Sequence, residues 1–248
     1  MAWVLDLDGV VWLDDEPLPG AANAVARLRE SGQRVVFLTN NSSLPVADYV
    51  TKLRKMGIAA IEADVITSAQ AAASLLAPNS TALVCGGRGV DEALQRRGVR
   101  TVIQGRADAV VVGFHQEFDY GRLTAAFRAV RAGARLIGTN ADPTYPTPAG
   151  PVPGAGAILA SVAYAAGVEP ELAGKPNEPI VRLVSERVGR VHTMVGDRPS
   201  TDGKLARRLG CRFALVLSGV TEESDLPVDP SPDVVTATLA DLVDQELL

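Results

Sequence analysis

The side chains best suited to chemistry in this sequence are carboxylates that end a short apolar run. Asp6 and Asp8 close the run Trp3–Leu7 and are followed by Gly9. Carboxylates at positions i and i+2 lie on the same side of an extended chain, so they repel unless a cation separates them or one is protonated. Mg²⁺ favours oxygen ligands and retains waters and a substrate phosphate. The pair therefore predicts magnesium-assisted phosphate chemistry with Asp8 as proton carrier, although an acidic pair alone is equally typical of a solvated turn.

A second acidic motif follows the apolar run His192–Val195. It reads Gly196-Asp197-Arg198-Pro199-Ser200-Thr201-Asp202 and leads into a predicted helix. Asp197, at the strand end, is predicted to share a magnesium ion with Asp6. Asp202 fits both a helix N-cap or first-turn acid and a group that supports the metal, and the two roles are compatible.

Phosphate-binding donors are predicted in two further segments. Thr39-Asn40-Asn41-Ser42 ends another apolar run, so Thr39 is expected to face a phosphate, with Ser42 or Ser43 as the N-cap of the next helix. Lys175, between Gly174 and Pro176, precedes a predicted helix, where its ammonium would neutralise phosphate oxygens. Gly9 lets backbone N–H groups turn toward the same phosphate.

Alternating strands and helices must position these groups. Apolar runs predict strands at Trp3–Leu7, Arg34–Thr39, Ala82–Cys85, Ala109–Gly113, Arg135–Gly138, His192–Val195, Phe213–Leu217 and Asp233–Ala237. Apolar stripes that stop at a glycine predict helices at Ala21–Ser31, Pro45–Met56, Arg122–Ala132 and Asp202–Leu209. The alternation indicates an α/β fold with a mainly parallel sheet, in which ligands bind outside the carboxyl ends of the strands.

One segment and the overall composition complete this interpretation. Asn140–Gly156 is dense in Pro and Gly and is expected to be a functional loop without regular structure. The net charge of −5 over 248 residues argues against a nucleic acid partner. The start Met1-Ala2-Trp3 lacks a signal-peptide pattern, and no apolar run approaches the ~18 residues of a membrane span. A cytoplasmic protein without a membrane partner, with Cys85 and Cys211 as ordinary buried thiols, is predicted.

Together these motifs resemble the haloacid dehalogenase-like (HAD) phosphatases, in their NagD-like, 4-nitrophenylphosphatase-like branch with a type IIA cap. The resemblance is carried by four motifs in order: Asp6-x-Asp8-Gly9-Val10, Thr39-Asn40-Asn41, Gly174-Lys175-Pro176 and Gly196-Asp197…Thr201-Asp202. It extends over almost the whole chain, through Pro19-Gly20, Thr67-Ser68-Ala69 and Pro153-Gly154-Ala155-Gly156.

The resemblance implies a Rossmann-like catalytic domain with an inserted α/β cap. Here the catalytic domain would comprise residues 1–69 and 173–248, and the cap, which selects the substrate, residues 70–172. Asp6 would become an aspartyl phosphate and Asp8 would act as general acid and base. Thr39, Asn40 and Lys175 would hold the phosphoryl oxygens. The ligands implied for Mg²⁺ are Asp6, the backbone carbonyl of Asp8, Asp197 and, in support, Asp202.

The substrate is expected to be a small phosphate monoester, such as a sugar phosphate or nucleoside monophosphate, with 4-nitrophenyl phosphate as an artificial one. Asn140, Asp142 and Tyr145 are candidate substrate contacts in the cap, and a homodimer through the cap is plausible for this branch. His115 stands where an aspartate is expected in the branch and is interpreted as a surface residue. His192 is interpreted as structural.

Other functions remain open at this point. Gly87-Arg88-Gly89 and Gly154-Ala155-Gly156 are glycine-rich, but neither fits the dinucleotide-binding pattern. A non-catalytic phospho-acceptor domain would have no use for Asp8, and a dehalogenase would need neither Asp8 nor the metal carboxylates. A phosphomutase is compatible with the core motifs.

Overall fold

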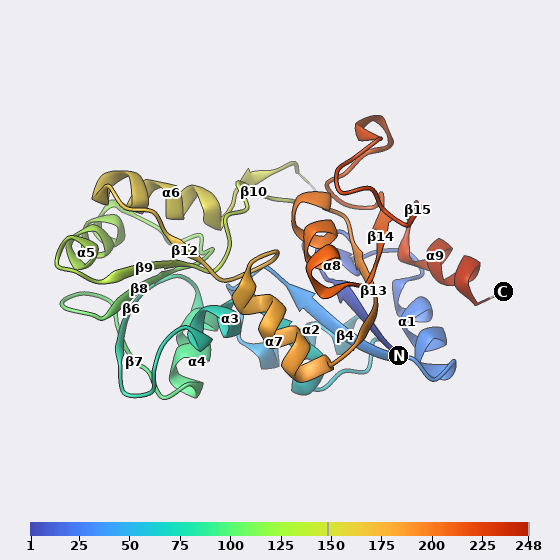
Figure 1. Ribbon diagram of the computed structural model, residues 1–248, viewed down its shortest axis with the longest axis horizontal. Helices are drawn as coiled ribbons and strands as arrows, with labels where there is room; N and C mark the ends of the chain where they lie inside the picture. Colours follow the sequence, from blue (N-terminus) through green and yellow to red (C-terminus); the bar gives the residue numbers. More distant parts are fainter. Residues whose placement is uncertain (148, 248) are drawn as a thin grey trace.

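The chain folds into two parallel β-sheets placed end to end, with helices on the faces of both (Figure 1). The structure is a computed structural model that describes residues 1–147 and 149–247. The larger sheet has the order β15-β14-β13-β1-β4-β5, and all its neighbouring strands are parallel. Its strands are β1 (Ala2–Asp6), β4 (Arg34–Thr39), β5 (Val65–Thr67), β13 (Val191–Gly196), β14 (Arg212–Val216) and β15 (Val234–Thr236).

The smaller sheet has the order β12-β9-β8-β6-β7 and is also parallel. Its strands are β6 (Thr81–Cys85), β7 (Arg100–Val102), β8 (Ala109–Val112), β9 (Arg135–Gly138) and β12 (Glu171–Leu172). Two short hairpins, β2 (Trp12–Leu13) with β3 (Glu16–Pro17) and β10 (Thr144–Tyr145) with β11 (Val152–Pro153), lie outside the two sheets. Among the described strands, the smaller sheet therefore uses only residues 81–172, and the larger one residues on both sides of that insert.

Helices cover both faces of each sheet. They are α1 (Ala21–Glu30), α2 (Val46–Lys55), α3 (Ser68–Ser74), α4 (Arg88–Arg96), α5 (Tyr120–Arg131), α6 (Ala155–Ala166), α7 (Glu178–Val188), α8 (Lys204–Leu209) and α9 (Leu239–Glu246), with short turns of helix at Glu62–Asp64, Pro199–Gly203 and Glu223–Asp225. Helices α5 and α6 lie on one face of the smaller sheet and α4 on the other (Figure 1). None of the described helices combines the length and apolar character needed to cross a membrane.

One apolar core runs under both sheets. Buried residues of the larger sheet, such as Val36 and Met194, belong to the same packed cluster as Val84 and Ile137 of the smaller sheet. Helix α3, whose Ala71–Ala73 side chains are buried, packs against both α4 and α7 and joins the two halves of this cluster. Small side chains allow this close approach, so the two sheets are connected by a continuous interior.

The expected α/β fold is confirmed, and the eight strands expected from apolar runs are present within one or two residues. Helix α8 begins at Lys204 instead of Asp202, after an irregular turn at Pro199–Gly203. The short strands β5, β7 and β12 and the helices α3, α4 and α9 were not anticipated, whereas α7 is the helix expected after Lys175. The division into a catalytic domain (residues 1–69 and 173–248) and a cap (residues 70–172) stays a prediction.

Three local expectations were wrong. Asn140–Gly156 contains the hairpin β10–β11 and the start of α6, because Tyr145 and Val152 pair across the loop; Pro148 lies outside the described residues. Neither Ser42 nor Ser43 caps α2, whose N-cap is Pro45, and the Glu92 carboxylate accepts the Val46 N–H bond instead. Of the two thiols, Cys85 is buried and Cys211 only half-buried.

Candidate functional site

Four sequence motifs meet at one edge of the larger sheet. Asp6 is the last residue of β1, and Thr39 is the last residue of β4. Asp197 directly follows β13, and Lys175 lies between β12 and α7. Because β1 pairs in parallel with β4 and β13, their carboxyl ends converge. These residues line a pocket of about 50 Å³ together with Asp8, Asn40, Asn140, Asp142, Tyr145 and Arg198.

Lys175 holds two acidic side chains in this catalytic pocket. Its Nζ atom lies 2.8 Å from Asp6 Oδ1 and 2.7 Å from Asp202 Oδ1. Burial disfavours the ammonium, but the Asp202 and Asp6 carboxylates outweigh that effect and raise the Lys175 pKa. Lys175 is therefore a permanent positive charge beside Asp6. The same Asp6 oxygen accepts the Leu7 N–H bond, so these two contacts fix the Asp6 rotamer through Oδ1.

Asp6, Asp197 and Asp202 form an acidic cluster with the geometry of a metal site. Each offers a carboxylate oxygen, and the three oxygens lie within 4.8 Å of one another. Three carboxylates and the single Lys175 ammonium leave a formal charge of −2, which one divalent cation would balance. Carboxylate oxygens are hard ligands that suit Mg²⁺. The residues therefore fit the expected metal.

The chain backbone comes close around this cluster. A Cβ atom at Gly9, whose φ is +82°, would collide with the Asp197 carboxylate, and so would one at Gly219. Asp197 Oδ2 accepts the Val220 N–H bond at 2.7 Å. Positions 9 and 219 therefore both have to be glycine for the Asp197 side chain to lie where it does.

The acidic cluster is electrostatically strained without a cation. Burial raises the pKa of Asp197 to about 7, and the Asp202 carboxylate adds to this effect. Burial also raises the Asp6 pKa, against the opposing effect of Lys175. Like charges gathered in a dry site need a positive partner.

Asp202 is held by hydrogen bonds through both oxygens. Oδ1 binds Lys175, and Oδ2 accepts the Arg198 N–H bond at 3.1 Å. Asp202 therefore connects the Lys175 loop to the Asp197 loop, which suits the supporting role expected of it. A helix N-cap role is not adopted, because α8 begins two residues later, with Gly203 as its N-cap.

Asp8 points away from the acidic cluster. Asp8 Oδ1 accepts hydrogen bonds from Trp12 Nε1 and from the Tyr145 hydroxyl, both at 3.0 Å. Thr39 Oγ1 lies 3.4 Å from the other oxygen, Oδ2. Burial raises the Asp8 pKa, although the hydrogen bonds from Trp12 and Tyr145 act to lower it. The two acids of the Asp6-x-Asp8 motif thus have separate environments, one beside a cation site and one beside the open side of the pocket.

Asn40 connects the segments that bring the motifs together. Its Nδ2 atom donates to Asp142 at 3.0 Å and to the Lys175 carbonyl at 3.3 Å, while its Oδ1 atom accepts the Lys175 N–H bond at 2.8 Å. Asn140 Nδ2 donates to the Asn40 carbonyl at 2.6 Å. The Asn40 side chain thus binds that of Asp142, the Asn140 side chain binds backbone groups of Asn40 and Asp142, and Tyr145 reaches Asp8.

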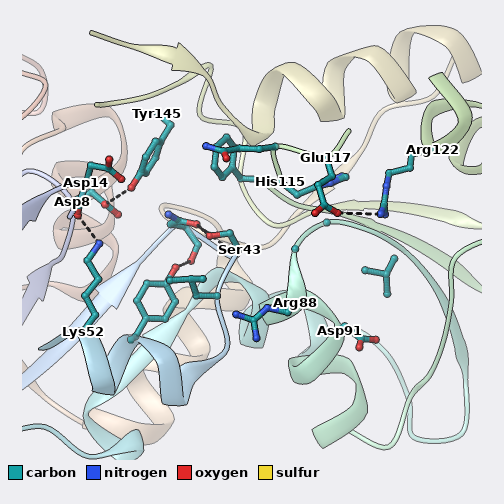
Figure 2. Close-up of a pocket in the computed structure, with 18 of the residues that line it drawn as sticks. Asp8, Asp14, Ser43, Lys52, Arg88, Asp91, His115, Glu117, Arg122 and Tyr145 are labelled. Atoms are coloured by element: carbon teal, nitrogen blue, oxygen red, sulfur yellow. Dashed lines mark hydrogen bonds and ion pairs between the residues drawn. The ribbon is translucent and has the colours of Figure 1, made fainter. Parts of the chain in front are cut away.

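A second, larger cavity opens on the Asp8 side of the catalytic pocket. It has a volume of about 890 Å³ and lies between the two sheets, and it shares Asp8, Asn41, Phe114 and Tyr145 with the catalytic pocket. Figure 2 shows Asp8, Lys52 and Tyr145 on one side of this cavity and Glu117 and Arg122 on the opposite side. We call it the outer cavity.

His115 was interpreted as a surface residue, and that interpretation is wrong. It is only 8% exposed, lines the outer cavity and packs edge-on against Phe118, because the chain after β8 turns inward there. Its Nε2 atom is buried without a hydrogen-bond partner among the described residues. Burial and the nearby Arg122 lower the His115 pKa. His192, by contrast, lies in β13 as expected, stacked on Trp3.

Several pocket residues were missed in the sequence, and three of them make direct contacts near Asp8. Trp12 contacts Asp8, Lys52 lies 4.5 Å over the Trp12 ring, and Phe114 stacks on Tyr145 with ring centroids 5.2 Å apart. The four-residue spacing between Asp8 and Trp12 gave a weak signal for the first. The other two depend on contacts between segments far apart in the sequence.

Comparison with known proteins places this architecture in a family. A model described as haloacid dehalogenase-like hydrolase matches residues 3–100, and a HAD-hydrolase-like model matches residues 172–242. A D-glycerol 3-phosphate phosphatase of Mycobacterium tuberculosis is 35% identical over 229 residues, or 90% of this chain, which spans only 64% of that relative. A 4-nitrophenylphosphatase structure from Thermotoga maritima is 37% identical with a TM-score of 0.89, over 98% of this chain and 96% of that one. The chain belongs to the haloacid dehalogenase-like hydrolases.

Within this family, the resemblance to 4-nitrophenylphosphatase-like members is confirmed. A further similar structure is a glycerol phosphate phosphatase of M. tuberculosis in complex with magnesium. It is 34% identical, with a TM-score of 0.89, over 97% of this chain and 75% of that one. Because this match covers 97% of the chain, it includes both β-sheets.

Proposed function

We propose that this protein is a magnesium-dependent phosphatase that hydrolyses small phosphate monoesters through an aspartyl phosphate on Asp6. The observation that carries the proposal is the separation of the two acids of one motif. Asp6 lies in the acidic cluster with Lys175 2.8 Å away, while Asp8 is turned to the outer cavity by Trp12 and Tyr145. A nucleophile beside positive charge and a proton carrier beside the leaving group are what phosphoryl transfer requires.

In the first step, the Asp6 carboxylate attacks phosphorus in line. The bond between Asp6 and phosphorus forms as the bond to the leaving oxygen breaks, and Asp8 gives its proton to that oxygen. Since the contacts of Asp6 to Lys175 and Leu7 both use Oδ1, we assign the attack to Oδ2. Lys175, Thr39 and the Asn40 segment surround the transferred phosphoryl group.

In the second step, water releases the phosphate. Asp8, now a carboxylate, takes a proton from water while the oxygen of that water bonds to phosphorus and the bond to Asp6 breaks. Inorganic phosphate leaves and Asp6 is regenerated. The hydrogen bonds from Trp12 and Tyr145 keep Asp8 in place for both proton transfers.

Magnesium would be held by Asp6, Asp197 and the backbone carbonyl of Asp8, with Asp202 in support. When bound, it supplies positive charge that orients the phosphate and reduces its repulsion from the attacking carboxylate. The fit of the acidic cluster and the magnesium complex of the glycerol phosphate phosphatase of M. tuberculosis support this cofactor.

The domain organisation is part of the same proposal. Residues 1–69 and 173–248 would form the catalytic domain, since the strands whose ends carry Asp6, Thr39 and Asp197 all lie there. Residues 70–172 would form the cap, which brings Tyr145 and the far wall of the outer cavity. A homodimer through the cap and a cytoplasmic location stay predictions, testable by light scattering and by cell fractionation.

The experiment is phosphate release from a panel of phosphorylated metabolites and 4-nitrophenyl phosphate, with Mg²⁺ and with EDTA. Release that needs Mg²⁺ is expected. Covalent labelling of Asp6, detected by mass spectrometry after rapid acid quenching, would show the intermediate. Labelling without release would point to a phospho-acceptor domain, and transfer of phosphate within a substrate would point to a phosphomutase. No turnover of any ester by folded, Mg²⁺-loaded protein would refute the proposal.

A further inference from the structure

The outer cavity adjoins the atom from which the leaving group takes its proton. Asp8 and Tyr145 belong to both the catalytic pocket and the outer cavity, so a group that departs from phosphorus toward Asp8 departs into the outer cavity. The catalytic pocket, at about 50 Å³, has room for little beyond the phosphoryl group, whereas the outer cavity measures about 890 Å³. The chemistry of the outer cavity wall therefore decides which leaving groups are accepted.

Every lysine and arginine of that wall already has an acidic partner. Lys52 pairs with Asp15 at 3.0 Å, Arg88 with Asp48 at 2.8 Å and Arg122 with Glu117 at 3.7 Å. Figure 2 shows the Glu117–Arg122 pair on the side of the cavity opposite Asp8. The nearby carboxylate offsets much of the positive charge that each of these cations would present to an incoming anion.

Two acids of the same wall have no such partner. Within residues 1–147 and 149–247, neither Asp14 nor Asp91 forms an ion pair, and Asp91 only accepts a hydrogen bond from Gln95 at 2.9 Å. Together with Asp8, when it is ionised, they make the cavity electronegative. His115 adds no positive charge to offset them, since burial and Arg122 favour its neutral form.

The part of the wall next to Asp8 is aromatic. Trp12, Phe114 and Tyr145 stand there, with Phe114 stacked on Tyr145 and the Trp12 and Tyr145 polar atoms both directed at Asp8 Oδ1. Aromatic faces pack well against the C–H groups of polyols and sugars, and they offer nothing to a carboxylate or phosphate.

We propose that the outer cavity selects phosphate monoesters with an uncharged, hydroxyl-bearing leaving group and rejects those that carry a second anionic group. This inference rests on the proposed phosphatase function. Paired cations give no receptor for a second anion, and Asp14 and Asp91 repel one. Charge, and not size, is the property by which the cavity discriminates between small esters.

The test compares glycerol 3-phosphate with 3-phosphoglycerate, which have three carbons each and differ at the end remote from the ester, an uncharged alcohol in one and a carboxylate in the other. With Mg²⁺ present, kcat/KM for glycerol 3-phosphate should exceed that for 3-phosphoglycerate by at least about tenfold, the size expected for a like charge at close range. Equal values, or a preference for 3-phosphoglycerate, would overturn the inference.

Variants that remove a single charge from a side chain show which residues cause the preference for glycerol 3-phosphate. In Asp14→Asn/Asp91→Asn the preference should fall by about threefold or more, since the size of both side chains is kept. Asp48→Asn, which frees Arg88, should also lower it. The matched control is Glu223→Gln on the exposed turn at Glu223–Asp225, where the wild-type ratio should persist. An unchanged ratio in both test variants would contradict the role of the cavity charges.

The same measurements separate this inference from the proposed function. Turnover of 4-nitrophenyl phosphate with no preference between the two three-carbon esters would refute the charge selection alone. Absence of turnover for all three esters would refute the phosphatase proposal and this inference with it.

Discussion

The catalytic pocket and the outer cavity are neighbours that differ in size, in burial and in how firmly their charged groups are held. In the catalytic pocket, Asp202 and Lys175 are almost fully buried, and the polar atoms of both are held by hydrogen bonds or ion pairs. The outer cavity is far larger, and its charged groups, such as Arg88 and Glu117, are mostly solvent-exposed. A dry, fully bonded site fixes positions to fractions of an ångström, whereas a wet cavity adjusts to its occupant. The chemical step and the choice of substrate are therefore separable in this molecule.

The largest expected effect tests the catalytic pocket alone. Asp6→Asn removes the nucleophile and a metal ligand together, so turnover of every ester should fall by at least about 10⁴-fold while the fold is kept. Phosphate release and circular dichroism check this, with Asp244→Asn, an exposed partner of Arg27, as control. Activity comparable to wild type in Asp6→Asn would exclude the covalent mechanism.

Asp8→Ala tests the boundary between the two regions. Alkyl phosphates have poor leaving groups that need a proton, so their kcat should fall by about 10²–10⁴-fold. Aryl esters such as 4-nitrophenyl phosphate need little protonation and should lose much less. The measurement is the ratio of the two losses, and equal losses would show that Asp8 is not the general acid.

The next effect is on stability and concerns the acidic cluster only. The pKa of Asp197 is raised in the folded protein to about 7, from an ordinary value of 3.8, so the folded state binds its proton more tightly than the unfolded state. Without metal, the Asp197 contribution to stability should therefore fall as pH rises from about 4 to about 7, by at most about 4 kcal/mol, and stay low above that.

Thermal unfolding in EDTA checks this dependence. The loss of Tm between pH 5 and pH 8 should be smaller in Asp197→Asn, and added Mg²⁺ should raise the wild-type Tm more at pH 8 than at pH 5. A wild-type Tm that responds to pH in the same way as the variant would show that Asp197 is not strained.

The smallest expected effect comes from Tyr145→Phe, which removes one of two hydrogen bonds to Asp8 Oδ1. Because Trp12 still donates to that oxygen, kcat for alkyl phosphates should fall only about tenfold, a size typical of one hydrogen bond to a charged group. The loss should be smaller for 4-nitrophenyl phosphate. Tyr164→Phe, at a hydroxyl-bearing ring that is 92% exposed, is the control. A loss equal on both substrates would mean that Tyr145 acts on binding and not on Asp8.

The catalytic pocket was far more predictable from the sequence than the outer cavity. Asp6, Thr39 and Asp197 end strands rich in Val and Leu, so a local pattern was enough to place them at one edge of a parallel sheet. The expected phosphate and metal residues lie together, although their individual roles stay predictions. Asn40 is the instructive exception, since its side chain bridges Asp142 and the Lys175 loop and only tertiary contacts reveal this.

The outer cavity depends on contacts that no local pattern encodes. His115 becomes buried because the segment after β8 turns toward α5, and Tyr145 reaches Asp8 only because a loop rich in Pro and Gly closes into the hairpin β10–β11. Helix α3 was missed for a related reason. Its run of alanines shows no apolar stripe, yet small side chains are what close packing between α4 and α7 demands.

That packing has a consequence for how the molecule comes apart. Since Val36, Ala72 and Ile137 lie in one apolar cluster beneath both sheets, neither sheet can lose this shared part of its interior without exposing that of the other. The whole chain should then melt as a single cooperative unit, with a calorimetric enthalpy that matches the van't Hoff value. Excision of residues 70–172 would leave the remainder with an uncovered apolar face. We therefore expect that neither sheet can be removed or exchanged without destabilising the other.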